Sequence, residues 1–230
     1  MIISYLNKFI FIRVPKTAST SVEVALTRFC GPEDVISGVH FHNDVENAIL
    51  DYEGERNIDR LHLKPFNQFI RNLTGQPPID YKHASAKNLR SLLSRKDWEG
   101  FYKFCFVRNP FDRVLSLYHW RMKNWEKKHA ELKPSINQYI SDLEPNKITT
   151  WQRYTIHGKI VVDHVARYED LHDEFKKISK TLGLELVELP MNKSSIRKDK
   201  TPYRELLDKT SRTKIELLCA KEMVEFGYHW

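Results

Sequence analysis

The apolar positions near the start of the chain follow a strand pattern first and a helix pattern soon after. Residues 9–14 (FIFIRV) are strand-compatible, and Pro15 ends the predicted strand because it has no backbone N–H. The next apolar side chains recur with the i, i+3, i+4, i+7 spacing of a helix: Val22, Ala25, Leu26 and Phe29. Gly31 and Pro32 are typical of the end of such a helix. The pattern therefore predicts a strand, a short loop and a helix.

The loop between this strand and this helix carries a lysine and several hydroxyl groups. Its six residues are Lys16, Thr17, Ala18, Ser19, Thr20 and Ser21. A helix N-terminus has unpaired N–H groups and the positive end of the helix dipole, so it favours an anion. The stretch therefore predicts a phosphate cradle. It is not a Walker A loop, because the lysine directly follows the proline and the loop has no glycine.

A second strand and helix, with polar residues between them, are predicted near the middle of the chain. Residues 101–107 form a continuous apolar run that predicts a buried parallel strand, and Asn109 and Pro110 are favoured at a helix start. The helix is expected to reach about Asn124, and its apolar stripe consists of Phe111, Val114, Leu115, Tyr118 and Met122. Ser116 lies off this stripe, so it faces either a ligand or solvent.

Weaker patterns predict the remaining elements. These are strands over 34–41 and 160–166, a strand ending near His83, a helix capped by Ser85, partly helical structure over 44–72, a helix ended by Gly183, and a last helix over about 211–226 ended by Gly227. Elements of both types in one chain favour an α/β fold.

Composition narrows the kinds of ligand and compartment. The 230 residues carry a formal net charge of +7, which suits an anionic ligand such as a nucleotide, a nucleic acid or an acidic polysaccharide. Cys30, Cys105 and Cys219 are widely spaced in apolar patterns, which indicates buried free thiols in a reducing compartment. Residues 1–12 are too short to span a membrane and contain polar residues, so we expect a soluble, cytoplasmic protein.

Residues 15–21 (PKTASTS) and 104–116 (FCFVRNPFDRVLS) stand in the order and at the separation of a two-part signature. Together they resemble the motifs of sulfotransferases that use 3′-phosphoadenosine 5′-phosphosulfate (PAPS), and they are most similar to carbohydrate enzymes of the heparan sulfate 2-O type. The resemblance implies a single three-layer α/β domain over residues 1–230. It also implies a mostly parallel, P-loop-like central sheet, with the donor across the carboxyl ends of the strands.

The resemblance also implies an activity, which is transfer of the sulfuryl group of PAPS to an acceptor hydroxyl, with carbohydrate as the expected acceptor. Lys16 would stabilise the leaving phosphate. The rest of the loop would hold the 5′-phosphosulfate, through Thr17, Ala18, Ser19, Thr20 and Ser21. Arg108 and Ser116 would hold the 3′-phosphate, for which a planar guanidinium is well suited. Tyr168 would pack on the adenine. Ser194 and Arg197 would belong to a late loop that closes over the 3′-phosphate.

His83 lies between the two motifs and resembles the catalytic histidine of this family. As a general base it would take the proton of the acceptor hydroxyl. Heparan sulfate 2-O enzymes carry a His-x-His pair here, whereas this sequence has Tyr81 at the first position. If His83 is not the base, His40 and His42 are the next candidates. The resemblance implies no metal, no nucleic acid and no membrane partner.

Two other functions fit parts of the sequence. A P-loop kinase or NTPase would share the strand, loop and helix, but the Walker glycines are missing. A polyanion-binding protein would need only the basic charge. An acceptor could also bind near residues 122–151, because the tryptophans there stand beside basic residues, which suits a charged sugar: Trp120, Trp125 and Trp151.

Overall fold

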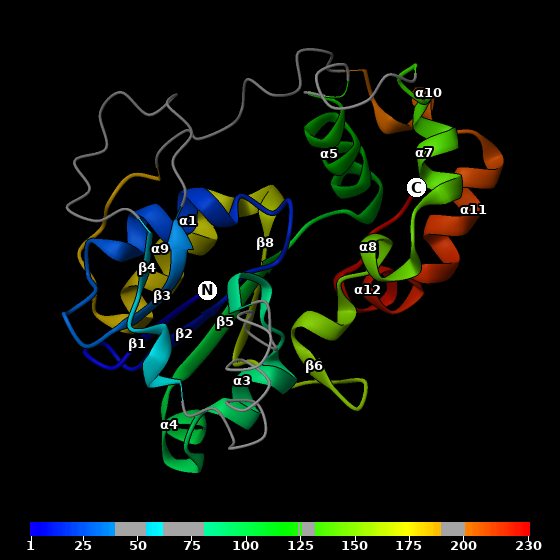
Figure 1. The fold of residues 1–230 in the computed structure, drawn as a ribbon. Coiled ribbons are helices and arrows are strands. Elements are labelled where there is room, and N and C mark those ends of the chain that lie inside the picture. Colours follow the sequence, from blue (N-terminus) through cyan, green and yellow to red (C-terminus); the bar gives the residue numbers. More distant parts are fainter. Residues whose placement is uncertain (40–53, 62–80, 124, 126–131, 190–200) are drawn as a thin grey trace, which may run out of the picture. The chain divides into compact units, whose positions relative to one another are not determined.

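The computed structural model describes residues 1–39, 54–61, 81–123, 125, 132–189 and 201–230 (Figure 1). These residues divide into two compact units. The first contains residues 1–107 and 152–192, and the second contains residues 108–151 and 193–230. We describe each unit by itself, and the single domain over residues 1–230 stays a prediction.

A six-stranded sheet forms the centre of the first unit. Its strands, in their order across the sheet, are β4 (Gly54–Arg56), β3 (Val35–Val39), β1 (Ile2–Ser4), β2 (Phe9–Ile12), β5 (Tyr102–Val107) and β8 (His164–Arg167). The pairs β2–β5 and β5–β8 are parallel, whereas β1 pairs antiparallel with β2 and β3, and β3 pairs antiparallel with β4. The sheet is therefore mixed. The parallel pairing that we expected holds for β2, β5 and β8, and β1 and β4 run in the opposite direction.

Both faces of this sheet are buried. One face carries Phe9, Phe11, Phe104 and Phe106, which form a core with the helices α1 (Ser19–Thr27) and α9 (Leu171–Leu182). On the other face, Ile10, Ile12 and Cys105 are also fully buried. The fold is thus of the α/β type that the sequence predicted, and the three-layer arrangement stays a prediction.

Shorter elements complete the first unit. They are the 3₁₀ turns η1 (Ile58–Arg60), η2 (Tyr81–His83) and η4 (Tyr168–Asp170), the helices α3 (Ala86–Leu92) and α4 (Arg95–Gly100), and the hairpin of β6 (Thr155–Ile156) and β7 (Lys159–Ile160). The turn η3 (Trp151–Arg153) stands where the chain passes from the second unit back to the first.

The second unit is helical in its described part. Its helices are α5 (Pro110–Met122), α7 (Ile136–Asp142), α8 (Pro145–Ile148), α10 (Tyr203–Leu206), α11 (Lys209–Leu218) and α12 (Ala220–Phe226). Apolar residues of α5, α7, α8 and α11 form its core, and most of the predicted α5 stripe lies in it: Phe111, Val114 and Leu115. In the part of the chain that the structure describes, no helix is long and apolar enough to cross a membrane.

Three predictions about local structure were wrong. The strand expected to end near His83 is the 3₁₀ turn η2, closed by the bond from the Ala84 N–H to the Tyr81 carbonyl. The last helix is two helices, because the backbone of Cys219 (φ −108°, ψ 15°) leaves the helical region between α11 and α12. The strand expected over 160–166 is divided between β7 and β8. The region 44–72 is described only over residues 54–61, which form β4 and η1.

The predicted free thiols are confirmed. Cys105 and Cys219 are buried, and Cys30 is half-buried. Burial raises the pKa of all three thiols, that of Cys30 to about 12, and the nearby Asp34 carboxylate adds to the shift at Cys30. Thiols with such raised pKa values carry little thiolate at neutral pH, so they are unreactive.

A buried carboxylate connects the strands of the first unit to α1. Glu23 lies in the middle of α1 and has no exposed surface. Its Oε1 accepts a hydrogen bond of 2.6 Å from the Met1 amino group, and its Oε2 accepts one of 2.6 Å from Nη1 of Arg13. The Met1 amino group also donates to Oγ of Ser37 in β3. One side chain therefore holds β1, the residue that follows β2, and α1 together.

Replacing this carboxylate should strongly destabilise the fold. We expect Glu23→Gln to lower the free energy of unfolding by about 3 kcal/mol, because it leaves the buried Met1 amino group and the half-buried Arg13 guanidinium without their counter-charge. Urea denaturation followed by circular dichroism measures the change. The matched control is Glu33→Gln, whose carboxylate pairs with Arg60 on the surface, and we expect a loss of less than about 1 kcal/mol there. Equal losses in the two variants would contradict the role of Glu23.

Candidate functional site

Three parallel strands end at the same edge of the sheet. Ile12 of β2 stands opposite Cys105 of β5, which in turn stands opposite Val165 of β8. The chain leaves this edge three times: through the loop before α1, through Arg108 after β5, and through η4 after β8. Sheets of this type bind ligands beyond the carboxyl ends of their parallel strands. The candidate site therefore begins at this edge.

The loop from β2 to α1 has a backbone conformation that non-glycine residues seldom adopt. Lys16 and Ala18 both have positive φ, 67° and 58°. Such alternation of left-handed residues turns successive backbone N–H groups toward one point, which forms an anion-binding nest. Strained backbone of this kind is concentrated at functional sites. Ala18 is also the N-cap of α1, and its side chain makes no capping hydrogen bond. The shape of the loop thus supports the predicted phosphate cradle.

The loop is shorter than predicted, because α1 already begins at Ser19, and the hydroxyl groups of the loop and of the first turn of α1 divide into two sets. Thr17 and Ser19 are buried, and each donates a hydrogen bond to the Val14 carbonyl, at 2.9 and 2.6 Å. These two hydroxyls therefore bind within the loop. A ligand at Thr17 or Ser19 would be bound by the backbone N–H groups of these residues instead. Thr20 is half-buried instead, and Ser21 is buried.

Arg13 connects the loop to the buried carboxylate. Its Nη1 binds Glu23, and its Nη2 donates to Oγ1 of Thr20 at 3.0 Å. The guanidinium thereby fixes the start of α1 relative to the end of β2. Lys16 is half-buried in the same loop. Sequence reasoning assigned no role to Arg13 or Glu23. The sequence did contain a signal for this contact. Glu23 lies beside the apolar positions of residues 22–29, and a charged side chain that is buried requires a partner of opposite charge.

His83 ends the 3₁₀ turn η2 and does not follow a strand. Its turn, η2, contacts β3. Burial lowers the pKa of the Met1 amino group, the Glu23 carboxylate opposes this shift, and the positive charges of Arg13 and Lys82 add to it. The His83 carbonyl accepts a hydrogen bond from Nη1 of Arg153, which anchors the turn.

Two predicted site residues belong to the second unit. Arg108 directly follows β5 in the chain, and its guanidinium donates to Oδ2 of Asp112 one helical turn later, with 2.7 Å from Nε. Asn109 caps α5 as predicted, since its Oδ1 accepts from the Phe111 N–H at 3.0 Å. Ser116 lies on α5 and is half-buried, away from the fully buried stripe. Asp112 would share the guanidinium with any phosphate bound by Arg108.

The other predicted residues are placed as follows. Tyr168 is half-buried in η4, directly after β8. Ser194, Arg197, His40 and His42 lie outside the described residues. Within the first unit, the loop before α1 and the start of η4 therefore both follow the carboxyl ends of parallel strands, and the turn of His83 contacts β3.

Comparison with known proteins identifies the family of the chain. The profile of the sulfotransferase family matches residues 1–229, and the chain therefore belongs to this family of transferase enzymes. Members of the family generally use PAPS as the donor and transfer its sulfuryl group to a hydroxyl-bearing acceptor. An uncharacterized protein of Archaeoglobus fulgidus is 31% identical to the chain over 99 residues, which cover 42% of this chain and 79% of that relative. No solved structure matches the chain.

Proposed function

We propose that the protein transfers the sulfuryl group of PAPS to a hydroxyl group of a carbohydrate. The observation that carries this proposal is the loop of residues 15–18, which leaves the carboxyl edge of β2 with two left-handed residues and leads into the N-terminus of α1. A nest, a helix dipole and the charge of Lys16 converge there, and all three favour a doubly anionic phosphosulfate.

The chemistry asks little of the protein beyond positioning and charge. The acceptor oxygen forms a bond to sulfur, the bond between sulfur and the bridging oxygen breaks, and negative charge grows on the departing 5′-phosphate. Lys16 would stabilise that charge, and backbone N–H groups at residues 17–21 would hold the phosphosulfate oxygens. Tyr168 would pack on the adenine. Arg108 and Ser116 would bind the 3′-phosphate, a role supported by the sequence motif alone. Ser194 and Arg197 would also contact the 3′-phosphate, and this role likewise rests on the sequence alone.

The acceptor side of the reaction rests on His83. Its imidazole would take the proton that the attacking hydroxyl loses. The hydrogen bond from Arg153 to the His83 carbonyl supports the role, because it anchors the turn that carries the imidazole. Carbohydrate is proposed as the acceptor because the motifs at residues 15–21 and 104–116 are most similar in sequence to those of carbohydrate sulfotransferases. The free thiols support the cytoplasmic location that we predicted, because disulfides are rare in reducing compartments.

Binding of the desulfated product tests the donor assignment. We expect 3′,5′-adenosine bisphosphate to bind at least tenfold more tightly than AMP or ATP in calorimetry, because only the bisphosphate carries the 3′-phosphate. Arg108→Ala should remove this preference, since a bidentate charge-assisted contact is lost. The control is Arg95→Ala, a change at an exposed arginine of α4. Equal affinity for all three nucleotides, or magnesium-dependent ATP turnover, would contradict the proposal and favour an NTPase.

Lys16 should act mainly on turnover. We expect Lys16→Ala to lower kcat roughly a hundredfold, in keeping with the loss of one preorganised donor at a developing negative charge. Transfer of radiolabelled sulfate from PAPS to a mixture of glycans measures the rate. Lys87→Ala, at an exposed position of α3, should behave like the unmodified protein. Near-normal turnover of the Lys16 variant would remove this residue from the catalytic machinery.

His83 should act on transfer alone. We expect His83→Ala to keep the affinity for the bisphosphate and to lose transfer, together with the acid limb of the pH–rate profile, because a general base must be unprotonated to work. The control is His172→Ala, at an exposed position of α9. Full activity of the His83 variant would assign the base to another residue, with His40 and His42 as the next to be changed.

A further inference from the structure

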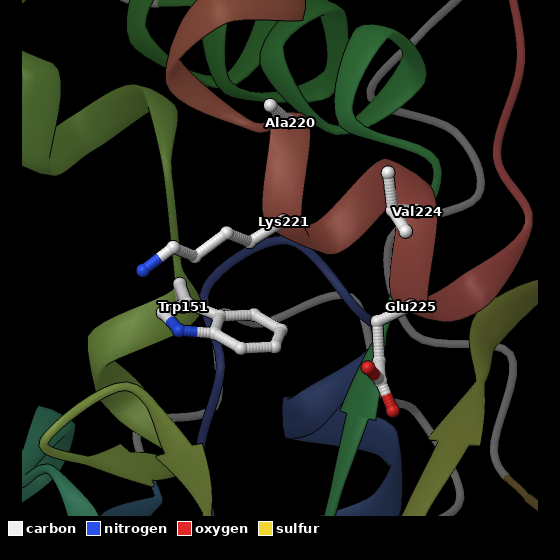
Figure 2. Close-up of a pocket in the computed structure, with 5 residues that line it drawn as sticks. All are labelled: Trp151, Ala220, Lys221, Val224 and Glu225. Carbon is white, nitrogen blue, oxygen red and sulfur yellow. The ribbon is translucent and has the colours of Figure 1, made fainter.

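A pocket of about 330 Å³ lies on the surface of the second unit, and none of its lining residues has a role in the proposed chemistry. It is lined by Trp151, Ala220, Lys221, Val224 and Glu225 (Figure 2). The indole of Trp151 forms one wall, and the first turns of α12 form the other. In Figure 2 the Trp151 ring lies between the side chains of Lys221 and Glu225. The volume is at the lower end of the range for small-molecule sites, which suits one ring rather than a large ligand.

The aromatic wall is held in place by a buried carboxylate. Glu222 is 4% exposed, and its Oε1 accepts hydrogen bonds from the N–H and the hydroxyl of Thr150, at 2.9 and 2.5 Å. Its Oε2 accepts from the hydroxyl of Thr149 at 3.3 Å, and that hydroxyl in turn accepts from the Trp151 N–H at 3.3 Å. The Trp151 ring also contacts the Phe226 ring, with 6.4 Å between centroids. The backbone of Trp151 is therefore fixed before any ligand binds, which reduces the entropy cost of binding.

Two opposite charges border the pocket. Lys221 and Glu225 are exposed and stand one turn apart on α12, and within the described ranges neither has an ion-pair or hydrogen-bond partner. An ammonium group only donates hydrogen bonds, and a carboxylate only accepts them. A hydroxyl group does both. A molecule with neighbouring hydroxyls can therefore accept from Lys221 and donate to Glu225 at the same time.

We propose that this pocket binds one pyranose ring of a carbohydrate. The apolar C–H face of the ring would lie on the indole of Trp151, and two of its hydroxyls would bind Lys221 and Glu225. The two charges cancel, so the pocket has no net attraction for sulfate or carboxylate groups and selects hydroxyl-rich, uncharged rings. The inference rests on the proposed function in one respect, since it names uncharged sugar units as part of the acceptor. The binding itself requires no donor and no catalysis.

The test follows the indole N–H signal of Trp151 in a two-dimensional ¹H–¹⁵N spectrum of the whole protein, assigned with Trp151→Phe. The probes are cellobiose and maltose at millimolar concentration. We expect a saturable shift of this signal with at least one disaccharide, and an affinity that changes less than twofold between 50 and 300 mM NaCl. Glu225→Gln and Lys221→Gln, both at exposed positions, should each weaken binding about threefold to tenfold. Trp151→Ala, followed by calorimetry, should weaken it tenfold or more.

Controls separate this proposal from the donor assignment. Trp120→Phe changes a tryptophan that does not line the pocket, and it should leave sugar binding unchanged. All pocket variants should keep the affinity for 3′,5′-adenosine bisphosphate. If the unmodified protein shows no preference for the bisphosphate over AMP and ATP, the proposed function is contradicted. The sugar site is not affected by that result.

Three results would overturn the sugar site. They are no saturable shift with either disaccharide, unchanged affinity in Trp151→Ala, and self-association in sedimentation that Trp151→Ala abolishes. The last result would mean that a second copy of the chain covers the pocket.

Discussion

The arrangement of the candidate site depends on the buried ion pairs of Glu23. A carboxylate without access to water is tolerated only when positive groups surround it, and here the Met1 amino group and Arg13 supply them. Arg13 in turn donates to Thr20, so the charge inside α1 also fixes the position of the loop beside it. The Glu23–Arg13 ion pair therefore holds the loop against α1. The hydroxyls of Thr17 and Ser19 stabilise only the turn itself.

This way of holding the loop explains how it dispenses with glycine. Left-handed residues other than glycine cost free energy, and two of them within three positions persist only where the surroundings determine the backbone. The Val14 carbonyl accepts from two hydroxyls, and Arg13 holds Thr20 from the other side. Together these contacts determine the backbone of residues 16 and 18. A lysine can therefore stand at the left-handed position 16, where glycine would be less strained but would carry no charge.

The sequence predicted the elements whose signals are local. Asn109, Ser85, Gly183 and Gly227 cap helices as expected, because capping depends on the chemistry of a few adjacent residues. The strand β1 was missed, since a strand of three residues is too short to show a period. The break at Cys219 was missed for another reason. The second of the two helices binds Thr149 and Thr150 through the buried Glu222, about seventy residues away in the chain, and no local pattern records such a contact.

The candidate site shows the same division between local and distant information. The anion-binding role of residues 16–21 was predicted from the lysine, the hydroxyls and the helix start together with the second motif at residues 104–116, and it stays a prediction. The support of this stretch by Arg13 and Glu23 was not predicted, because ion pairs depend on which elements meet.

The two ligands that we propose are recognised by different interactions. A net charge of +7 helps to attract an anionic donor, but it offers no discrimination among uncharged sugars. Discrimination among uncharged rings requires a fixed aromatic surface and a matched donor and acceptor, which Trp151, Lys221 and Glu225 provide without net charge.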